Sequence, residues 1–120
     1  MCYTETEQWV ERIDAVFLPV KNLEESLSWY QEVFNFSLRW KNERMCGLEI
    51  APNCGFHLVQ IPHFEPITTY TPFNYVVKDV EDARQRLLAK NIAVSPLRQG
   101  EPRRFDLTDL NGNMISVIEL

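Results

Sequence analysis

The sequence predicts an α+β fold in which two tandem βαβββ modules form a curved mixed sheet around a cavity. Residues 20–24 (VKNLE) are echoed by residues 77–81 (VKDVE) at an offset of 57, which indicates an internal repeat. In each copy this segment joins an apolar, strand-like stretch to residues with apolar side chains at helical spacing. Further short apolar stretches follow both helices, as expected for strands separated by turns.

The first module is predicted over residues 13–62 and begins with an apolar strand at residues 13–20. Asn22 can cap the following helix, because its side chain can accept a hydrogen bond from a first-turn backbone N–H. Asn35 stands where a residue in the left-handed conformation would end that helix. The apolar face of the helix is formed by Leu23, Leu27, Tyr30 and Phe34. Three strands at residues 36–40, 45–50 and 56–61 complete the module.

The second module is predicted over residues 72–120 and repeats this order. A strand at residues 73–77 leads into a helix that is capped by Asp79 and ends near residue 90, where Asn91 repeats the role of Asn35. Strands are expected near residues 93–97, 104–107 and 114–118, with a hairpin turn at residues 111–112. Residues 63–71 are predicted to be a linker, and residues 1–12 form an N-terminal extension to which the sequence assigns no role.

Composition restricts the possible partners. The 120 residues, 45% hydrophobic and 24% charged, fit a single globular domain, and a net charge of −5 argues against nucleic acid as a partner. No apolar run approaches the roughly 20 residues of a membrane-spanning helix, and the N-terminus does not look like a secretory signal. We therefore expect a cytoplasmic protein without a membrane partner. Cys2, Cys46 and Cys54 form no CxxC pair and are expected to be reduced thiols.

Two motifs in this framework resemble those of a known family. Residues 27–30 (LSWY) lie on the first helix, and residues 109–115 (DLNGNMI) precede the last strand. With the βαβββ repeat, they resemble the vicinal oxygen chelate superfamily, which contains glyoxalase I, bleomycin and fosfomycin resistance proteins and extradiol dioxygenases. The second motif is close to the family signature D-P-D-G-N-x-I-E-L, with Leu110 in place of Pro. The resemblance covers about residues 13–120, and because the family spans enzymes and non-catalytic binders it leaves open whether this chain is an enzyme.

The resemblance also implies where a metal would be held. Divalent metals in this family are bound by the first and fourth strands of each module, at positions that correspond here to Ala15, Val59, Pro72 and Ser116. Ala, Val and Pro have no side-chain donor, and a serine alone is a poor ligand, so we expect no metal cofactor. The alternative is one divalent ion held from shifted positions by donors such as His57, Glu49 and Asp106.

Side-chain alternation along the strands predicts a ligand site. If Val16 and Leu18 face the helix, Phe17 faces the cavity, and the same reasoning brings His57, Asn74 and Ser116 to it. Trp40 and Phe105 are added as candidate stacking surfaces. His57 could carry a proton or bind a ligand, or it could be a structural histidine with one hydrogen bond. The remaining cavity residues could likewise close on one another as ordinary core.

A cluster of arginines is the other candidate site. Arg98, Arg103 and Arg104 could bind an anionic group or form a solvated surface cluster.

These observations favour a metal-independent protein that binds a small organic molecule, similar to the bleomycin resistance proteins. The family resemblance further implies a homodimer. Two alternatives stay open: a divalent-metal-dependent enzyme of the glyoxalase or dioxygenase type acting on a small oxygenated substrate, and a non-catalytic dimeric interaction module.

Overall fold

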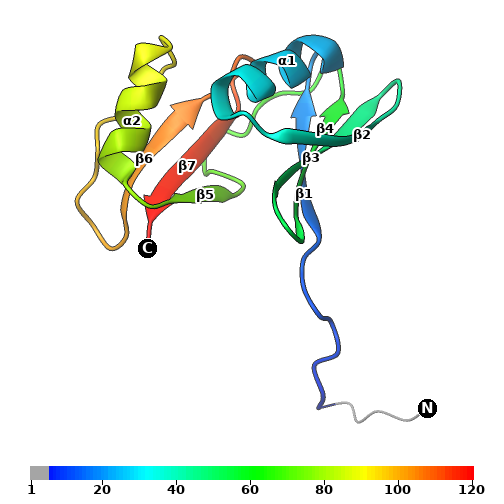
Figure 1. Ribbon diagram of the computed structural model, residues 1–120, viewed down its shortest axis with the longest axis horizontal. Helices are drawn as coiled ribbons and strands as arrows, with labels where there is room; N and C mark the ends of the chain where they lie inside the picture. Colours follow the sequence, from blue (N-terminus) through cyan, green and yellow to red (C-terminus); the bar gives the residue numbers. More distant parts are fainter. Residues whose placement is uncertain (1–5) are drawn as a thin grey trace.

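The computed structural model describes residues 6–120, so Cys2 and the start of the N-terminal extension lie outside the described residues. The fold is α+β, as predicted, and its strands form two separate sheets (Figure 1). None of the described helices is long and apolar enough to span a lipid bilayer.

The first module has the predicted βαβββ order. Its elements are β1 (Ala15–Val20), α1 (Leu23–Phe34), β2 (Ser37–Lys41), β3 (Met45–Ala51) and β4 (Cys54–Gln60). The strands lie in the order β1-β4-β3-β2, with β1 parallel to β4 and the other pairs antiparallel. Helix α1 packs on β3 and β4, so one face of the sheet is covered and the other stays open.

The second module contains β5 (Asn74–Val77), α2 (Val80–Ala89), β6 (Arg103–Thr108) and β7 (Met114–Glu119), in the sheet order β5-β7-β6. The strand expected near residues 93–97 does not form. Pro96 has no N–H to donate to a ladder, and the segment instead makes isolated bridges from Val94 to Leu107 and from Arg98 to Arg104. Helix α2 packs on β6 and β7, which again leaves one sheet face open.

Local signals set the helix boundaries as the sequence predicts. The Asn22 side chain accepts the Glu25 N–H at 2.9 Å, and the Asp79 side chain accepts the Asp82 N–H at 3.0 Å. Asn35 and Asn91 both have a φ of 60°, in the left-handed region that asparagine tolerates better than most residues. The two modules therefore begin and end their helices with the same chemistry.

Buried hydrogen bonds join the two modules at the turn between β6 and β7. Asp109, which is 5% exposed, accepts the Tyr30 hydroxyl of α1 at 2.6 Å through Oδ2. Its Oδ1 accepts the backbone N–H groups of Asn111 and Asn113, both at 2.8 Å. Asn113 Nδ2 also donates to the Pro19 carbonyl of β1 at 2.9 Å. We call Tyr30, Asp109, Asn111 and Asn113 the inter-module latch.

Candidate functional site

The open face of the first sheet carries one row of residues that crosses all four strands. Phe17 on β1 pairs in register with His57 on β4, His57 with Gly47 on β3, and Gly47 with Trp40 on β2. The Phe17 and His57 ring centroids are 4.8 Å apart and those of Trp40 and His57 are 5.1 Å apart, both in edge-to-face geometry. We call Phe17, His57 and Trp40 the aromatic row.

Gly47 allows this row to form. A Cβ at residue 47 would lie only 2.3 Å from Trp40 Nε1, so the indole ring occupies the space that any other side chain would need. Gly47 was not among the residues that the sequence pattern indicated. A glycine inside a strand pattern is nevertheless a known sign of a close approach, and it could have drawn attention to this position.

A cavity of about 470 Å³ opens beside the row. It is lined by Trp40 and His57 together with charged and polar residues, among them Asp14, Arg39, Glu49 and Asn53. Arg39 and Glu49 form an ion pair across β2 and β3. The Nδ1 atom of His57 is buried and has no hydrogen-bond partner among the described residues, which leaves one polar atom of the site unsatisfied.

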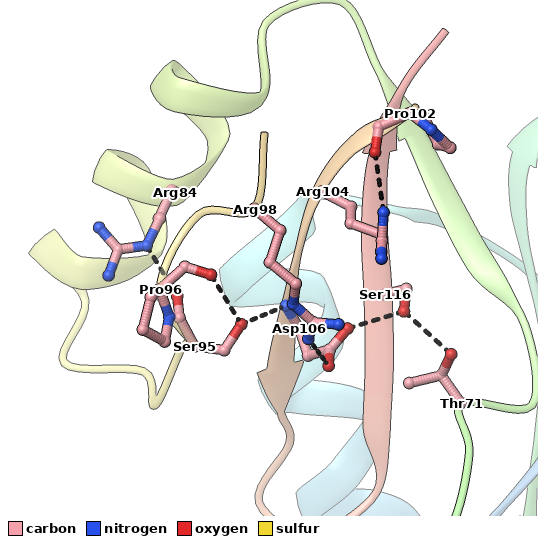
Figure 2. Close-up of polar contacts among 9 residues, drawn as sticks. All are labelled: Thr71, Arg84, Ser95, Pro96, Arg98, Pro102, Arg104, Asp106 and Ser116. Carbon is pink, nitrogen blue, oxygen red and sulfur yellow. Dashed lines mark hydrogen bonds and ion pairs between the residues drawn. The ribbon is translucent and has the colours of Figure 1, made fainter. Parts of the chain in front are cut away.

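The open face of the second sheet carries a row of polar residues. Asn74 on β5 pairs with Ser116 on β7, which pairs with Asp106 on β6. Figure 2 shows that the Ser116 hydroxyl connects two neighbours: it donates to Asp106 Oδ1 at 2.7 Å and lies 2.9 Å from Thr71 Oγ1. Arg98 Nη2 donates to Asp106 Oδ2 at 2.5 Å. This face thus presents hydroxyl, amide and ion-paired groups.

The structure therefore groups the predicted ligand residues in two sets. Phe17, His57 and Trp40 lie together on the first sheet, and Asn74 and Ser116 lie together on the second. Phe105 joins neither set, because it is fully buried in the core on the face of β6 opposite Asp106. A side chain without exposed surface offers nothing for a ligand to stack on, so Phe105 is left out of the candidate site.

The three arginines do not converge on one anion site. Arg98 pairs with Asp106, and Arg104 Nη1 donates to the Pro102 carbonyl at 3.1 Å (Figure 2). Arg103 pairs with Glu81 and Glu119. The side-chain hydrogen bond to Glu81 is the main cause that raises the pKa of Arg103. Each guanidinium is therefore engaged within the molecule.

The side chains present do not fit a metal centre of the family type. The four corresponding positions hold Ala15, Val59, Pro72 and Ser116, and only the serine has a side-chain donor. Between residues 6 and 120, no three His, Cys, Asp or Glu side chains come close enough together to hold one ion. His57 and Glu49 line the same cavity, whereas Asp106 lies on the other sheet, so the shifted donor set does not converge.

The chain was compared with protein-family models, curated sequences and solved structures. Residues 12–117 match the family model described as Glyoxalase/Bleomycin resistance protein/Dioxygenase superfamily. A comparison with curated protein sequences gave no match.

Similar solved structures include three with stated functions. The antibiotic-binding protein TnmS3 from Streptomyces sp. CB03234 matches with a TM-score of 0.80 and 19% identity, over 94% of this chain and 98% of that chain. A lactoylglutathione lyase from Agrobacterium tumefaciens matches with a TM-score of 0.76 and 16% identity, over 93% of this chain and 96% of that chain. The bleomycin resistance determinant encoded on transposon Tn5 matches with a TM-score of 0.73 and 11% identity, over 92% of this chain and 98% of that chain. At these identities the likeness shows the fold alone.

Proposed function

The chain belongs to the Glyoxalase/Bleomycin resistance protein/Dioxygenase superfamily, and we propose that it binds a small organic molecule on the open face of its first sheet without a metal. The aromatic row is the observation that carries this proposal. Phe17 is 58% exposed and Trp40 is 40% exposed, although both could have been buried in a core. Exposed aromatic rings beside a cavity lined by polar and charged residues offer a small molecule both apolar contact and hydrogen bonds.

The row also indicates the chemistry of the ligand. The rings on both sides of His57 offer apolar surface to a flat, apolar part of the ligand. His57 lines the cavity beside these rings, and its imidazole can donate or accept a hydrogen bond with a polar group of the ligand. The polar residues of the second sheet, Asn74 and Ser116, would contact polar groups of the same molecule if the two open faces enclose it.

Metal independence is supported by the chemistry of the donor positions. Three of the four have hydrocarbon side chains, and Lewis-acid catalysis requires an ion held by N, O or S ligands. Elemental analysis of tag-free protein, after incubation with Zn²⁺, Ni²⁺, Mn²⁺ or Fe²⁺ and desalting, is expected to give far less than one ion per chain. Near-stoichiometric retention of any of them would overturn this part of the proposal and favour the enzyme alternative.

The binding proposal can be tested with 8-anilinonaphthalene-1-sulfonate, an aromatic probe whose fluorescence rises in apolar sites. We expect saturable binding, and we expect Phe17→Ala and Trp40→Ala each to weaken it about tenfold, since one aromatic contact contributes up to about 1.5 kcal/mol. Leu88→Ala is the matched control, because Leu88 is an exposed apolar residue on α2. Equal binding by all four proteins would argue against the aromatic row as the site.

A homodimer in the cytoplasm completes the proposal. Strands β1 and β5 each have a neighbour on one side only, and an unpaired strand edge favours association with another chain. Cys46 and Cys54 are free thiols, which suits a reducing compartment. Sedimentation velocity at micromolar concentration is expected to give the mass of two chains; a single-chain mass would contradict the dimer.

A further inference from the structure

A second cavity, which we call the crevice, lies between the end of α1, the strand β5 and the helix α2. Its volume of about 530 Å³ is within the range of small-molecule sites, roughly 300–1,000 Å³. The aromatic row does not line it, although Cys54 borders both cavities. Most of its lining is apolar, including Val33, Phe34, Phe36, Val77, Leu87 and Val117. The crevice is therefore a separate candidate site, with room for one small molecule.

The walls of the crevice come from both modules and are held by contacts of the protein itself. The Lys90 side chain after α2 donates to the Glu32 carbonyl of α1 at 2.7 Å. The rings of Phe34 on α1 and Tyr75 on β5 pack edge to face, with their centroids 5.3 Å apart. The inter-module latch adds a buried connection elsewhere. Because these contacts fix the two helices around the cavity, binding would require little rearrangement of the protein.

Apolar and charged groups occupy different depths of the crevice. Val117 is 2% exposed and Leu87 is 5% exposed, so the floor is buried and apolar. Arg86 is the one charged side chain that lines the crevice among the described residues, and 77% of that side chain is exposed. Its Nε donates to Asp82 at 2.7 Å, whereas Nη1 and Nη2 have no partner among the described residues. A ligand with an apolar body and one anionic group at its outer end would match this arrangement.

The shape of the crevice favours a flexible ligand. All four residues of β5, Asn74–Val77, contribute to the lining. Successive side chains of a strand point to opposite faces of the sheet, so the crevice bends around the edge of β5 that has no strand neighbour. An unbranched hydrocarbon chain can follow such a bend, whereas a rigid ring system cannot.

We propose that the crevice binds an aliphatic monocarboxylate of the fatty-acid type. Its hydrocarbon chain lies on the buried floor formed by Leu87 and Val117, and its carboxylate binds the terminal nitrogens of Arg86. This site is distinct from the ligand site proposed for the first sheet, and neither proposal depends on the other.

The length of the hydrocarbon chain gives the first test. Isothermal titration calorimetry with hexanoate, octanoate, decanoate and dodecanoate is expected to show saturable binding of one molecule per protein chain. Affinity should rise about fourfold for each added methylene group, as expected from the burial of one CH₂, and should level off once the crevice is full. Lack of saturable binding by all four acids, or affinity independent of their length, would overturn the proposal.

Removal of the charge tests the role of Arg86. Arg86→Gln is expected to weaken decanoate binding about three- to fivefold, the effect of an ion pair exposed to water. Binding of decan-1-ol, which has the same chain without the carboxylate, should not change. Arg84→Gln is the matched control, because Arg84 lies on the same helix outside the crevice and donates to the Ser95 carbonyl at 2.9 Å. Equal losses for decanoate and decan-1-ol, or for the two variants, would refute the assigned carboxylate position.

Two kinds of variant locate the hydrocarbon chain. Ala83 lines the crevice, so Ala83→Leu should occupy part of it and weaken decanoate binding at least tenfold, with urea unfolding used to verify that the variant is folded. Phe17→Ala and Trp40→Ala should leave decanoate binding unchanged. If these two variants weaken it and Ala83→Leu does not, the acid binds at the aromatic row and the crevice proposal is refuted, while the proposed function of the first sheet stands.

Discussion

Replacing Tyr30 by phenylalanine is expected to loosen the contact between the two modules. The Tyr30 ring is fully buried, and its hydroxyl donates to Asp109 Oδ2 at 2.6 Å across 79 residues of sequence. Phenylalanine keeps the ring and removes only this hydrogen bond. The substitution therefore isolates one bond of the inter-module latch without creating a large cavity.

The size of the effect follows from the surroundings of the carboxylate. A hydrogen bond to a charged group contributes about 1.5–3 kcal/mol to stability. After the substitution, Asp109 Oδ2 keeps the Asn113 Nδ2 donor at 3.2 Å, and Oδ1 keeps both of its backbone donors. Because the carboxylate stays partly satisfied, we expect a loss of about 2 kcal/mol in the free energy of unfolding. In a domain of this size that corresponds to a fall in Tm of about 6–10 °C.

Tyr75→Phe is the matched control. Tyr75 is buried as well, but its hydroxyl has no hydrogen-bond partner among the described residues. Removing an unsatisfied buried hydroxyl is expected to leave stability unchanged or to raise it by up to about 1 kcal/mol. Urea unfolding followed by circular dichroism measures both variants. Equal destabilisation by the two substitutions would refute the reasoning. So would a loss below about 0.5 kcal/mol for Tyr30→Phe, because ordinary surface substitutions change the free energy of unfolding by up to that amount.

Three further predictions concern the helix cap, the site and pH. Asp79→Ala removes the N-cap of α2 and should cost about 1 kcal/mol in urea unfolding, with no loss meaning that the cap is not stabilising. Gly47→Ala should displace the Trp40 ring from β3 and weaken binding of 8-anilinonaphthalene-1-sulfonate about tenfold. The free energy of unfolding should change by less than about 1 kcal/mol, because an exposed ring can move aside. Unchanged binding would contradict the placement of Trp40. Burial raises the pKa of Tyr30 and Tyr75 well above the usual 10.0, so the folded chain holds these protons more tightly than the unfolded chain. The free energy of unfolding should therefore be unaffected by these groups below pH 10 and should fall as the pH rises further, as urea titrations at alkaline pH would measure. A flat profile in that range would contradict the buried positions of both rings.

The sequence was sufficient for the features that depend on neighbouring residues. The helix caps at Asn22 and Asp79 and the left-handed asparagines at positions 35 and 91 are confirmed, because each works through groups within a few residues of itself. Alternation also placed Leu18 in the core and Phe17 on the exposed face, since strand parity is a local property.

Contacts that depend on how distant segments pair could not be predicted from the sequence. The bond from Tyr30 to Asp109 joins residues that no spacing rule connects, and the helix pattern showed Tyr30 only as an apolar-face residue. The approach of Trp40 to Gly47 follows from the pairing of β2 with β3, which includes a register shift between Leu38 and Trp40. The absence of a strand near residues 93–97 has a local cause, because Pro96 has no N–H to donate to a strand ladder.

The repeat separates what the two halves share from what they do not. Their helices start and stop in the same way, whereas one open face is aromatic and the other is hydroxylic and ion-paired. After a duplication, each copy could accept new residues on its open face while the framework of caps and packed helices was preserved. Substitutions confined to the open faces, for example in a library, are therefore expected to cost little folding stability.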